Sequence, residues 1–251
     1  ILGIAFVVIV CGLAQFLVNP PSGYVASAAK SATAKPTATV NASPSQILHT
    51  PKFWLLWVIY FIGAGAGLMV ISSVSGMAKK SMGDLAFVAV AVMAIGNAGG
   101  RIGAGTLSDK IGRRWTLMLV LLIQAVLMFI AIPVTASKEM AAVVIVLVAA
   151  LIGANYGANL ALFPSFAKDL WGLKSFGVNY GVLFTAWGVG GFVLPRIQQM
   201  LTARSGGSYT SSFVSAGVLL VVGAALTLLL GERVKPEPAR VPETPLAAPA
   251  K

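Results

Sequence analysis

The sequence predicts an all-α membrane protein that crosses the bilayer several times. Of its 251 residues, 57% are hydrophobic and only 10% are charged, whereas soluble domains carry about 25% charged residues. The mean hydropathy is +0.88. Seven apolar stretches meet or approach the roughly 20 residues that a helix needs to cross a bilayer. So few charges could not cover a water-facing surface, which excludes a cytosolic enzyme.

The seven stretches predict seven transmembrane helices, because backbone groups inside lipid must be bonded within their own segment. The expected spans cover residues 1–18, 53–78, 85–107, 115–134, 140–166, 177–200 and 210–230. Five of them contain no charged residue, while the third contains Arg101 and the sixth contains Arg196 near its expected outer end.

The distribution of basic residues predicts the orientation. The net charge of +11 does not indicate nucleic-acid binding, because the basic residues are scattered between apolar runs. If residues 19–52 are cytoplasmic, the inner segments hold twelve Lys and Arg residues and the outer segments hold four. Such a bias is typical of cytoplasmic loops. We therefore expect the C-terminus in the cytoplasm, most simply of a bacterial inner membrane, and Arg196 as an anchor at the outer surface.

Four parts are expected along the chain. Residues 1–18 form the last helix of a preceding half, and 19–52 form a central cytoplasmic linker, flexible over 25–50 because that stretch is rich in Ala, Ser, Thr and Pro. Residues 53–231 form a compact six-helix bundle, since the loops between them are short. Residues 232–251 form a disordered tail. The chain opens inside an apolar run without Met, so we expect a fragment of a larger membrane protein.

The loop between the third and fourth spans carries the most specific pattern. It reads Gly-Thr-Leu-Ser-Asp-Lys-Ile-Gly-Arg-Arg over residues 105–114. Gly105 and Gly112 permit close approach and a tight reversal. Asp109 can accept from free N–H groups of a helix, while Arg113 and Arg114 hold the loop at an anionic membrane face. The alternative is an ordinary basic cytoplasmic loop.

This loop resembles the signature Gly-x-x-x-Asp-x-x-Gly-Arg-Arg of the major facilitator superfamily. One helix, a long linker and six closely connected helices resemble helix 6, the central loop and helices 7–12 of that family. The resemblance implies a transporter whose N-terminal half-bundle is this chain's partner. Within the superfamily, residues 19–24 and 179–191 resemble motifs of the oxalate/formate antiporter family, which is related to the monocarboxylate transporters and moves small organic anions.

Arg101 is the strongest candidate for substrate binding. An arginine in lipid costs at least about 2.5 kcal/mol and usually faces a partner or a watery cavity, and its fork matches a carboxylate. Asn97 lies four residues earlier, on the same helix face. Gly99 and Gly103 should let a neighbouring backbone approach closely. The alternatives are snorkelling of Arg101 and pairing with an acid of the other half.

The resemblance also bears on the substrate. Monocarboxylate transporters have an Asp where this sequence has Asn97, so a coupling proton would ride on the substrate or on a group in the other half. Oxalate carriers pair the arginine with a Lys in helix 11, and residues 177–200 contain no Lys. One cation favours a monocarboxylate such as lactate or pyruvate; an oxalate/formate-type exchanger is the alternative.

Four further residues are candidates for the substrate site. Tyr156 and Asn159 are three residues apart and could face a cavity together, or they could bond neighbouring helices. Phe184 and Trp187 are also three apart and could form an apolar wall, although core packing is the commoner role. The glycines of 63–67 indicate close packing or bending.

Other classes of function receive little support. Cys11 has no partner for a disulfide and His49 is the only histidine, so neither a disulfide framework nor a histidine-rich metal site is expected. The spans contain no His, Asp or Glu, which disfavours an enzyme, and we expect no cofactor. A retinal receptor would need a Lys in the last span, and 210–230 has none. A receptor of another type or a channel remains the alternative from a different class.

Overall fold

The computed structural model describes residues 2–16, 41–136 and 142–231, and the regular structure in these ranges is helical. The chain divides into two units, 1–37 and 38–251. The first contains α1 (Leu2–Ala14), an apolar helix of 13 residues, which is shorter than the roughly 20 residues of a span. The expected span 1–18 is thus described only in part, and the linker 19–40 and the tail 232–251 lie outside the described residues.

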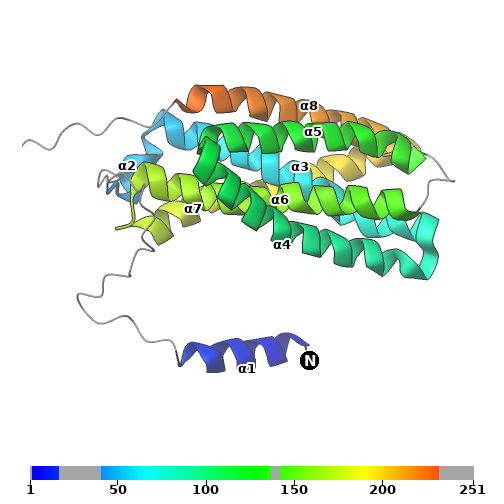
Figure 1. Cartoon of the computed structure of the whole chain (residues 1–251), viewed down its shortest axis with the longest axis horizontal. Helices are drawn as coiled ribbons and strands as arrows, with labels where there is room; N and C mark the ends of the chain where they lie inside the picture. Colours follow the sequence, from blue (N-terminus) through cyan, green and yellow to red (C-terminus); the bar gives the residue numbers. More distant parts are fainter. Residues whose placement is uncertain (1, 17–40, 137–141, 232–251) are drawn as a thin grey trace, which may run out of the picture. The chain divides into compact units, whose positions relative to one another are not determined.

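The second unit is a helical bundle (Figure 1). Six of its described helices are long and apolar enough to cross a membrane, which confirms six of the expected spans. They extend a few residues beyond the apolar runs, because a helix continues into water past the lipid. The helices are α3 (Pro51–Met82), α4 (Ala86–Ile111), α5 (Arg113–Ala136), α6 (Ala142–Trp171), α7 (Phe176–Arg204) and α8 (Thr210–Thr227), with short 3₁₀ turns at Gly83–Leu85 and Leu228–Leu230.

The structure corrects the expectation of a flexible connector at its C-terminal end. Residues 41–50 are ordered, and α2 (Pro44–Leu48) begins at a capping box in which Ser43 and Gln46 bond each other's backbone N–H. The Ala42 N–H donates to the Trp171 carbonyl, 3.0 Å away, and Ile47 is fully buried. An apolar residue and satisfied backbone groups therefore fix this segment on the bundle despite its small neighbours.

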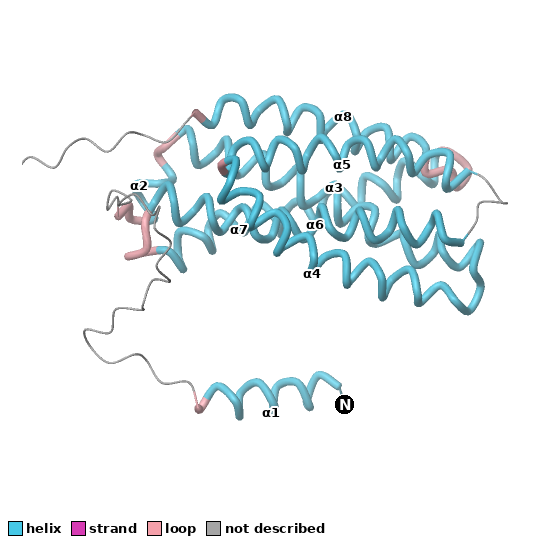
Figure 2. Tube along the Cα trace, in the orientation of Figure 1, coloured by secondary structure: helices cyan, strands magenta, loops and turns pink. Residues whose placement is uncertain are grey.

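The six long helices pack mainly as three pairs, α4 with α6, α3 with α7 and α5 with α8. Figure 2 shows α5 and α8 running side by side and α4 crossing α6. The α4–α6 contact brings backbone against backbone: a Cβ at Gly100 would overlap the Ala154 carbonyl oxygen, and one at Gly157 would overlap that of Asn97.

The glycines that make this contact differ from those expected. Gly96 and Gly100 face α6, whereas a Cβ at Gly99 or Gly103 would meet open space. Gly96 and Gly100 make this contact because α6 places its own Gly153 and Gly157 against the same side of α4. The glycines of 63–67 do lie in close contacts, Gly65 against the backbone of Gly190, as the sequence predicts.

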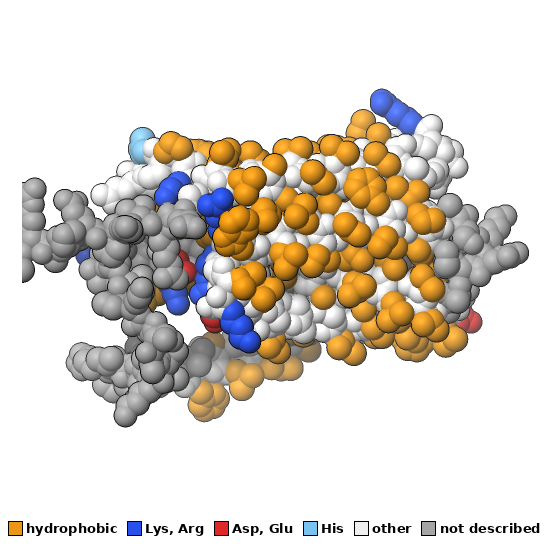
Figure 3. Space-filling view, turned by 45° about the horizontal axis from the view of Figure 1, so that its top comes forward, with side chains coloured by type: hydrophobic (Ala, Val, Ile, Leu, Met, Phe, Trp, Pro, Cys, Tyr) orange, Lys and Arg blue, Asp and Glu red, His pale blue; other side chains and the backbone are white. Residues whose placement is uncertain are grey.

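The two ends of the bundle differ in charge. We call the end that holds α2, the α4–α5 junction and the α6–α7 loop the α2 end. Basic side chains gather toward it, while apolar side chains cover the middle of the bundle (Figure 3). The basic residues at this end are Lys52, Lys110, Arg113, Arg114, Lys168 and Lys174. This asymmetry is the one from which the sequence predicts a cytoplasmic α2 end.

Candidate functional site

Arg101 lies within the spanning part of α4, ten residues before the helix ends at Ile111. At 1.5 Å per residue this places it about 15 Å from that end and about 9 Å from Leu107, where the apolar run ends, so snorkelling stays the alternative role of Arg101. Its Nε donates to Asn97 Oδ1 at 3.1 Å, so Asn97 orients the guanidinium. Within the described residues no carboxylate pairs with Arg101, and its four terminal N–H groups stay available.

Three tyrosines lie on three other helices of the bundle, Tyr60 on α3, Tyr156 on α6 and Tyr180 on α7. The hydroxyl oxygens of Tyr60 and Tyr180 are 3.4 Å apart. Tyr156 is almost completely buried, and its hydroxyl accepts a hydrogen bond of 2.7 Å from Trp187 Nε1. The sequence names Tyr156 and Trp187 as separate candidates, and the structure joins them by this hydrogen bond.

Aromatic side chains form a continuous row along one side of α7. Phe176 stacks on Tyr180 with ring centroids 5.9 Å apart, Tyr180 lies 5.5 Å from Phe184, and Phe184 stacks on Trp187 at 5.0 Å. We call these four residues the aromatic row. All four are half-buried, so part of each ring stays open on the side that no helix of this unit covers.

Asn159 does not join this group. It is fully buried, and its Nδ2 donates to Gln124 Oε1 on α5 and to the Asn155 carbonyl. Gln124 in turn donates to the Gly63 carbonyl on α3. Side chains three residues apart point in directions about 60° apart around a helix. Asn159 is therefore directed toward α5, while Tyr156 is directed toward α7. The structure thus shows the alternative role, a bond to a neighbouring helix.

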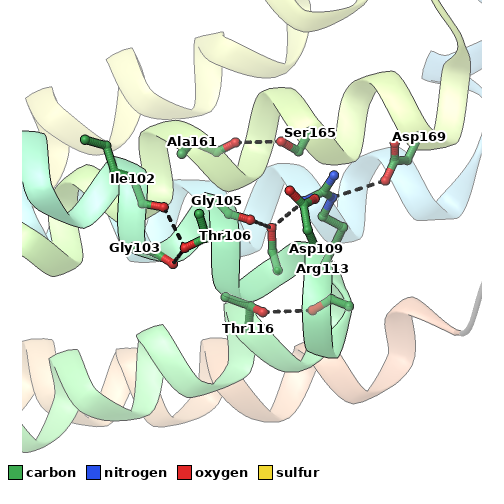
Figure 4. A network of polar contacts seen from close by, with 12 residues as sticks. Ile102, Gly103, Gly105, Thr106, Asp109, Arg113, Thr116, Ala161, Ser165 and Asp169 are labelled. Atoms are coloured by element: carbon green, nitrogen blue, oxygen red, sulfur yellow. Dashed lines mark hydrogen bonds and ion pairs between the residues drawn. The ribbon is translucent and has the colours of Figure 1, made fainter. Parts of the chain in front are cut away.

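The loop between α4 and α5 holds a second cluster of polar contacts (Figure 4). Gly112, with φ of +92°, makes the reversal between the two helices. Arg113 pairs with Asp109 at 2.7 Å and with Asp169 of α6 at 3.2 Å, and it donates to Ser108 Oγ. The sequence does not point to Asp169, which comes 56 residues after Arg113.

Two residues of this loop, Asp109 and Gly105, differ from expectation. Asp109 binds the Arg113 side chain instead of helix N–H groups. A Cβ at Gly105 would meet open space, so no neighbour among the described residues requires a glycine there. The Arg114 guanidinium lies over the Trp115 ring, 5.0 Å from its centroid, and its Nε is buried without a hydrogen-bond partner among the described residues.

Six apolar spanning helices with short connections, and a charged side chain within one of them, define a polytopic helical membrane protein. This chain belongs to the Major Facilitator Superfamily. The sequence model of that family matches residues 1–195 and, in a second alignment, residues 88–250.

Curated relatives agree with this assignment. The chain is 32% identical over 143 residues to the oxalate:formate antiporter of Oxalobacter formigenes, covering 56% of this chain and 34% of the relative. It is 30% identical over 153 residues to the uncharacterized MFS-type transporter YhjX of Escherichia coli, covering 58% and 36%. The MFS transporter asaE of Aspergillus flavus is 30% identical over 155 residues, covering 62% and 34%. The matched region thus spans about a third of each of these relatives.

Proposed function

We propose that this chain forms the C-terminal half of a secondary transporter that moves small organic anions, with monocarboxylates such as lactate or pyruvate as the preferred substrates. The observation that carries the proposal is Arg101, an arginine in a spanning helix that is oriented by Asn97 and has four N–H groups free of partners among the described residues. A guanidinium of this kind matches a carboxylate in a bidentate geometry.

In this proposal the carboxylate binds Arg101, Phe184 and Trp187 form an apolar wall for the short carbon chain, and the N-terminal half-bundle supplies the opposite wall. Alternating access moves the site between the two sides of the bilayer, with the α2 end in the cytoplasm of a bacterial cell. A coupling proton travels on the substrate or on the other half, because the apolar stretches 53–78, 85–107, 115–134, 140–166, 177–200 and 210–230 contain no Asp or Glu.

A second candidate is oxalate/formate-type exchange, which the similarity to the Oxalobacter antiporter favours. The two candidates differ in the charge that the site must balance. Residues 177–200 of this chain contain no Lys, so Arg101 offers one positive charge. Uptake of labelled lactate and labelled oxalate into the same proteoliposomes separates the candidates.

The decisive experiment substitutes Arg101 in the transporter that joins this chain to its N-terminal half. Arg101→Lys keeps the charge but loses the fork, and a charged hydrogen bond contributes about 1.5–3 kcal/mol, so lactate binding should weaken by roughly 10- to 150-fold. Arg196→Lys at the outer end of α7 is the matched control and should bind normally. If folded Arg101→Ala protein carried its monocarboxylate like the parent, Arg101 would not be the anion site.

A further inference from the structure

The ordered end of the linker is bonded to the end of α6 and to the α6–α7 loop. We call residues 41–50 the clip. The Ala42 N–H donates to the Trp171 carbonyl at the end of α6, 3.0 Å away. Asn41 Oδ1 accepts from the Lys174 N–H at 3.2 Å, although the two residues are 133 positions apart in the chain. The linker is therefore attached to the α6–α7 loop before it reaches the start of α3.

Asn179 joins the clip to α7 and has one polar atom left over. The proposed function gives this residue no role. Its side chain is fully buried, and its Nδ2 donates to the Ala42 carbonyl at 2.9 Å. Its Oδ1 is buried without a hydrogen-bond partner among the described residues. A buried acceptor without a partner is unfavourable, and water would reach it if the clip moved away. Asn179 thus stabilises the closed clip with one bond, while its Oδ1 favours opening.

The other contacts of the clip suit a segment that opens as a unit. Among residues 41–50 only Ile47 is buried. The capping box between Ser43 and Gln46 lies within the clip, so it does not depend on the bundle. A segment that contributes one buried side chain and a few hydrogen bonds can open while the rest of the protein stays folded. The long helices need not separate for the clip to leave them.

We propose that the clip opens and closes on the folded bundle and that Asn179 holds it closed. In the closed state the clip attaches the linker to the α6–α7 loop and to α7. In the open state the linker is attached directly to α3, which begins at Pro51. A force along the linker therefore acts on α7 only while the clip is closed. Asn179 is a positioning residue that acts on the linker through Ala42, and its role does not depend on Arg101 or on the substrate.

Amide hydrogen exchange in the purified transporter that contains this chain and its N-terminal half tests the proposal. The N–H groups of Ala42 and Lys174 bond across the contact, so their exchange rates, each relative to that of the unfolded peptide, report opening. Asn179→Asp keeps the size of the side chain but removes the donor. Both amides should then exchange faster by about 2- to 10-fold, the equivalent of one hydrogen bond. Asn41→Asp is the matched control: the same chemical change keeps the acceptor for Lys174, so neither amide should exchange faster.

Ile47→Val is a second, milder way to open the clip. It removes one buried methylene group and should raise both rates by roughly 2- to 10-fold, and it decides the matter if Asn179→Asp does not fold. The amides of α8 should keep their rates in every variant. Unchanged rates at Ala42 and Lys174 would overturn the proposal, and so would an equal rise in α8, which would show that the whole bundle opens. Loss of the proposed function, with lactate binding that does not depend on Arg101, would leave these rates as they are.

Discussion

The α4–α6 pair and the α5–α8 pair are held together in different ways. In α4–α6 the two backbones touch, with glycines of each helix against carbonyl groups of the other. In α5–α8 side chains fill the contact, as where the Phe129 ring of α5 lies over Gly217 of α8. The first pair carries Arg101 and Tyr156, while the second carries none of the candidate substrate-site residues.

The two helix pairs should therefore differ in rigidity. Backbones in contact cannot adjust by changing rotamers, so the α4–α6 contact fixes where Arg101 and Tyr156 lie relative to each other. A contact made by side chains can repack with small loss, because cores tolerate changes that conserve volume. The α4–α6 pair should therefore be the more sensitive to added atoms, and the α5–α8 pair the more tolerant.

The largest effect on stability is expected at Gly100. In Gly100→Ala the added methyl group overlaps the Ala154 carbonyl, so the two helices must move apart. Overpacking of this kind costs about 1–3 kcal/mol, which should lower the melting temperature in detergent and weaken lactate binding at the displaced Arg101. Gly99→Ala is the matched control: its methyl group meets open space, and alanine favours the helix by up to about 1 kcal/mol. Equal melting temperatures for the two variants would show that the backbones are not in contact.

The same helices show which features of the fold can be predicted from the sequence. Hydropathy predicts the bounds of the six spans between 53 and 230 to within a few residues of the observed helices, because the hydrophobicity that a span needs is a property of each segment alone. Which face of a helix meets its neighbour is a property of two segments. The sequence therefore indicated a glycine contact on α4 but assigned it to Gly99 and Gly103, since the glycines of α6 that select the other stripe lie more than 50 residues away.

The candidate site follows the same rule. Arg101 and Asn97 could be paired from their spacing on one helix, and the structure joins them. Tyr60 and Tyr180 meet only through the packing of α3 against α7, and no local pattern marks them. Asn159 turned out to bond α5 because its direction depends on where Gln124 lies. Residues 41–50 read as a linker by composition, yet the buried Ile47 holds them on the bundle.

An intermediate effect is expected where the two pairs are tied together. Arg113 at the start of α5 binds Asp169 near the end of α6, and both side chains are less than one-fifth exposed. Asp169→Asn removes one charge of this pair but leaves Asp109 beside Arg113, so unfolding should become easier by about 1 kcal/mol. Asp109→Asn should cost less than about 0.5 kcal/mol, because Asp109 is 67% exposed and exposed pairs contribute little.

Denaturation of both variants at low and high salt checks this prediction. The parent and Asp109→Asn should differ little at either ionic strength. A larger loss in Asp109→Asn than in Asp169→Asn would mean that the contact within the loop, and not the tie between α5 and α6, stabilises this end of the bundle.

The smallest effect is expected at Gly217, in the side-chain-packed pair. A Cβ there would lie 2.7 Å from Phe129 Cζ, which is the far end of a ring that is 41% exposed and can swing away from α8. The gain in helix propensity, up to about 1 kcal/mol, should offset most of this repacking, so Gly217→Ala should change stability by less than about 1 kcal/mol. In a Phe129→Leu background the ring atoms that would contact the added methyl group are absent, so Gly217→Ala should be stabilising there. A double-mutant cycle by thermal denaturation measures the coupling; a loss in Gly217→Ala as large as in Gly100→Ala would remove the distinction between the two helix pairs.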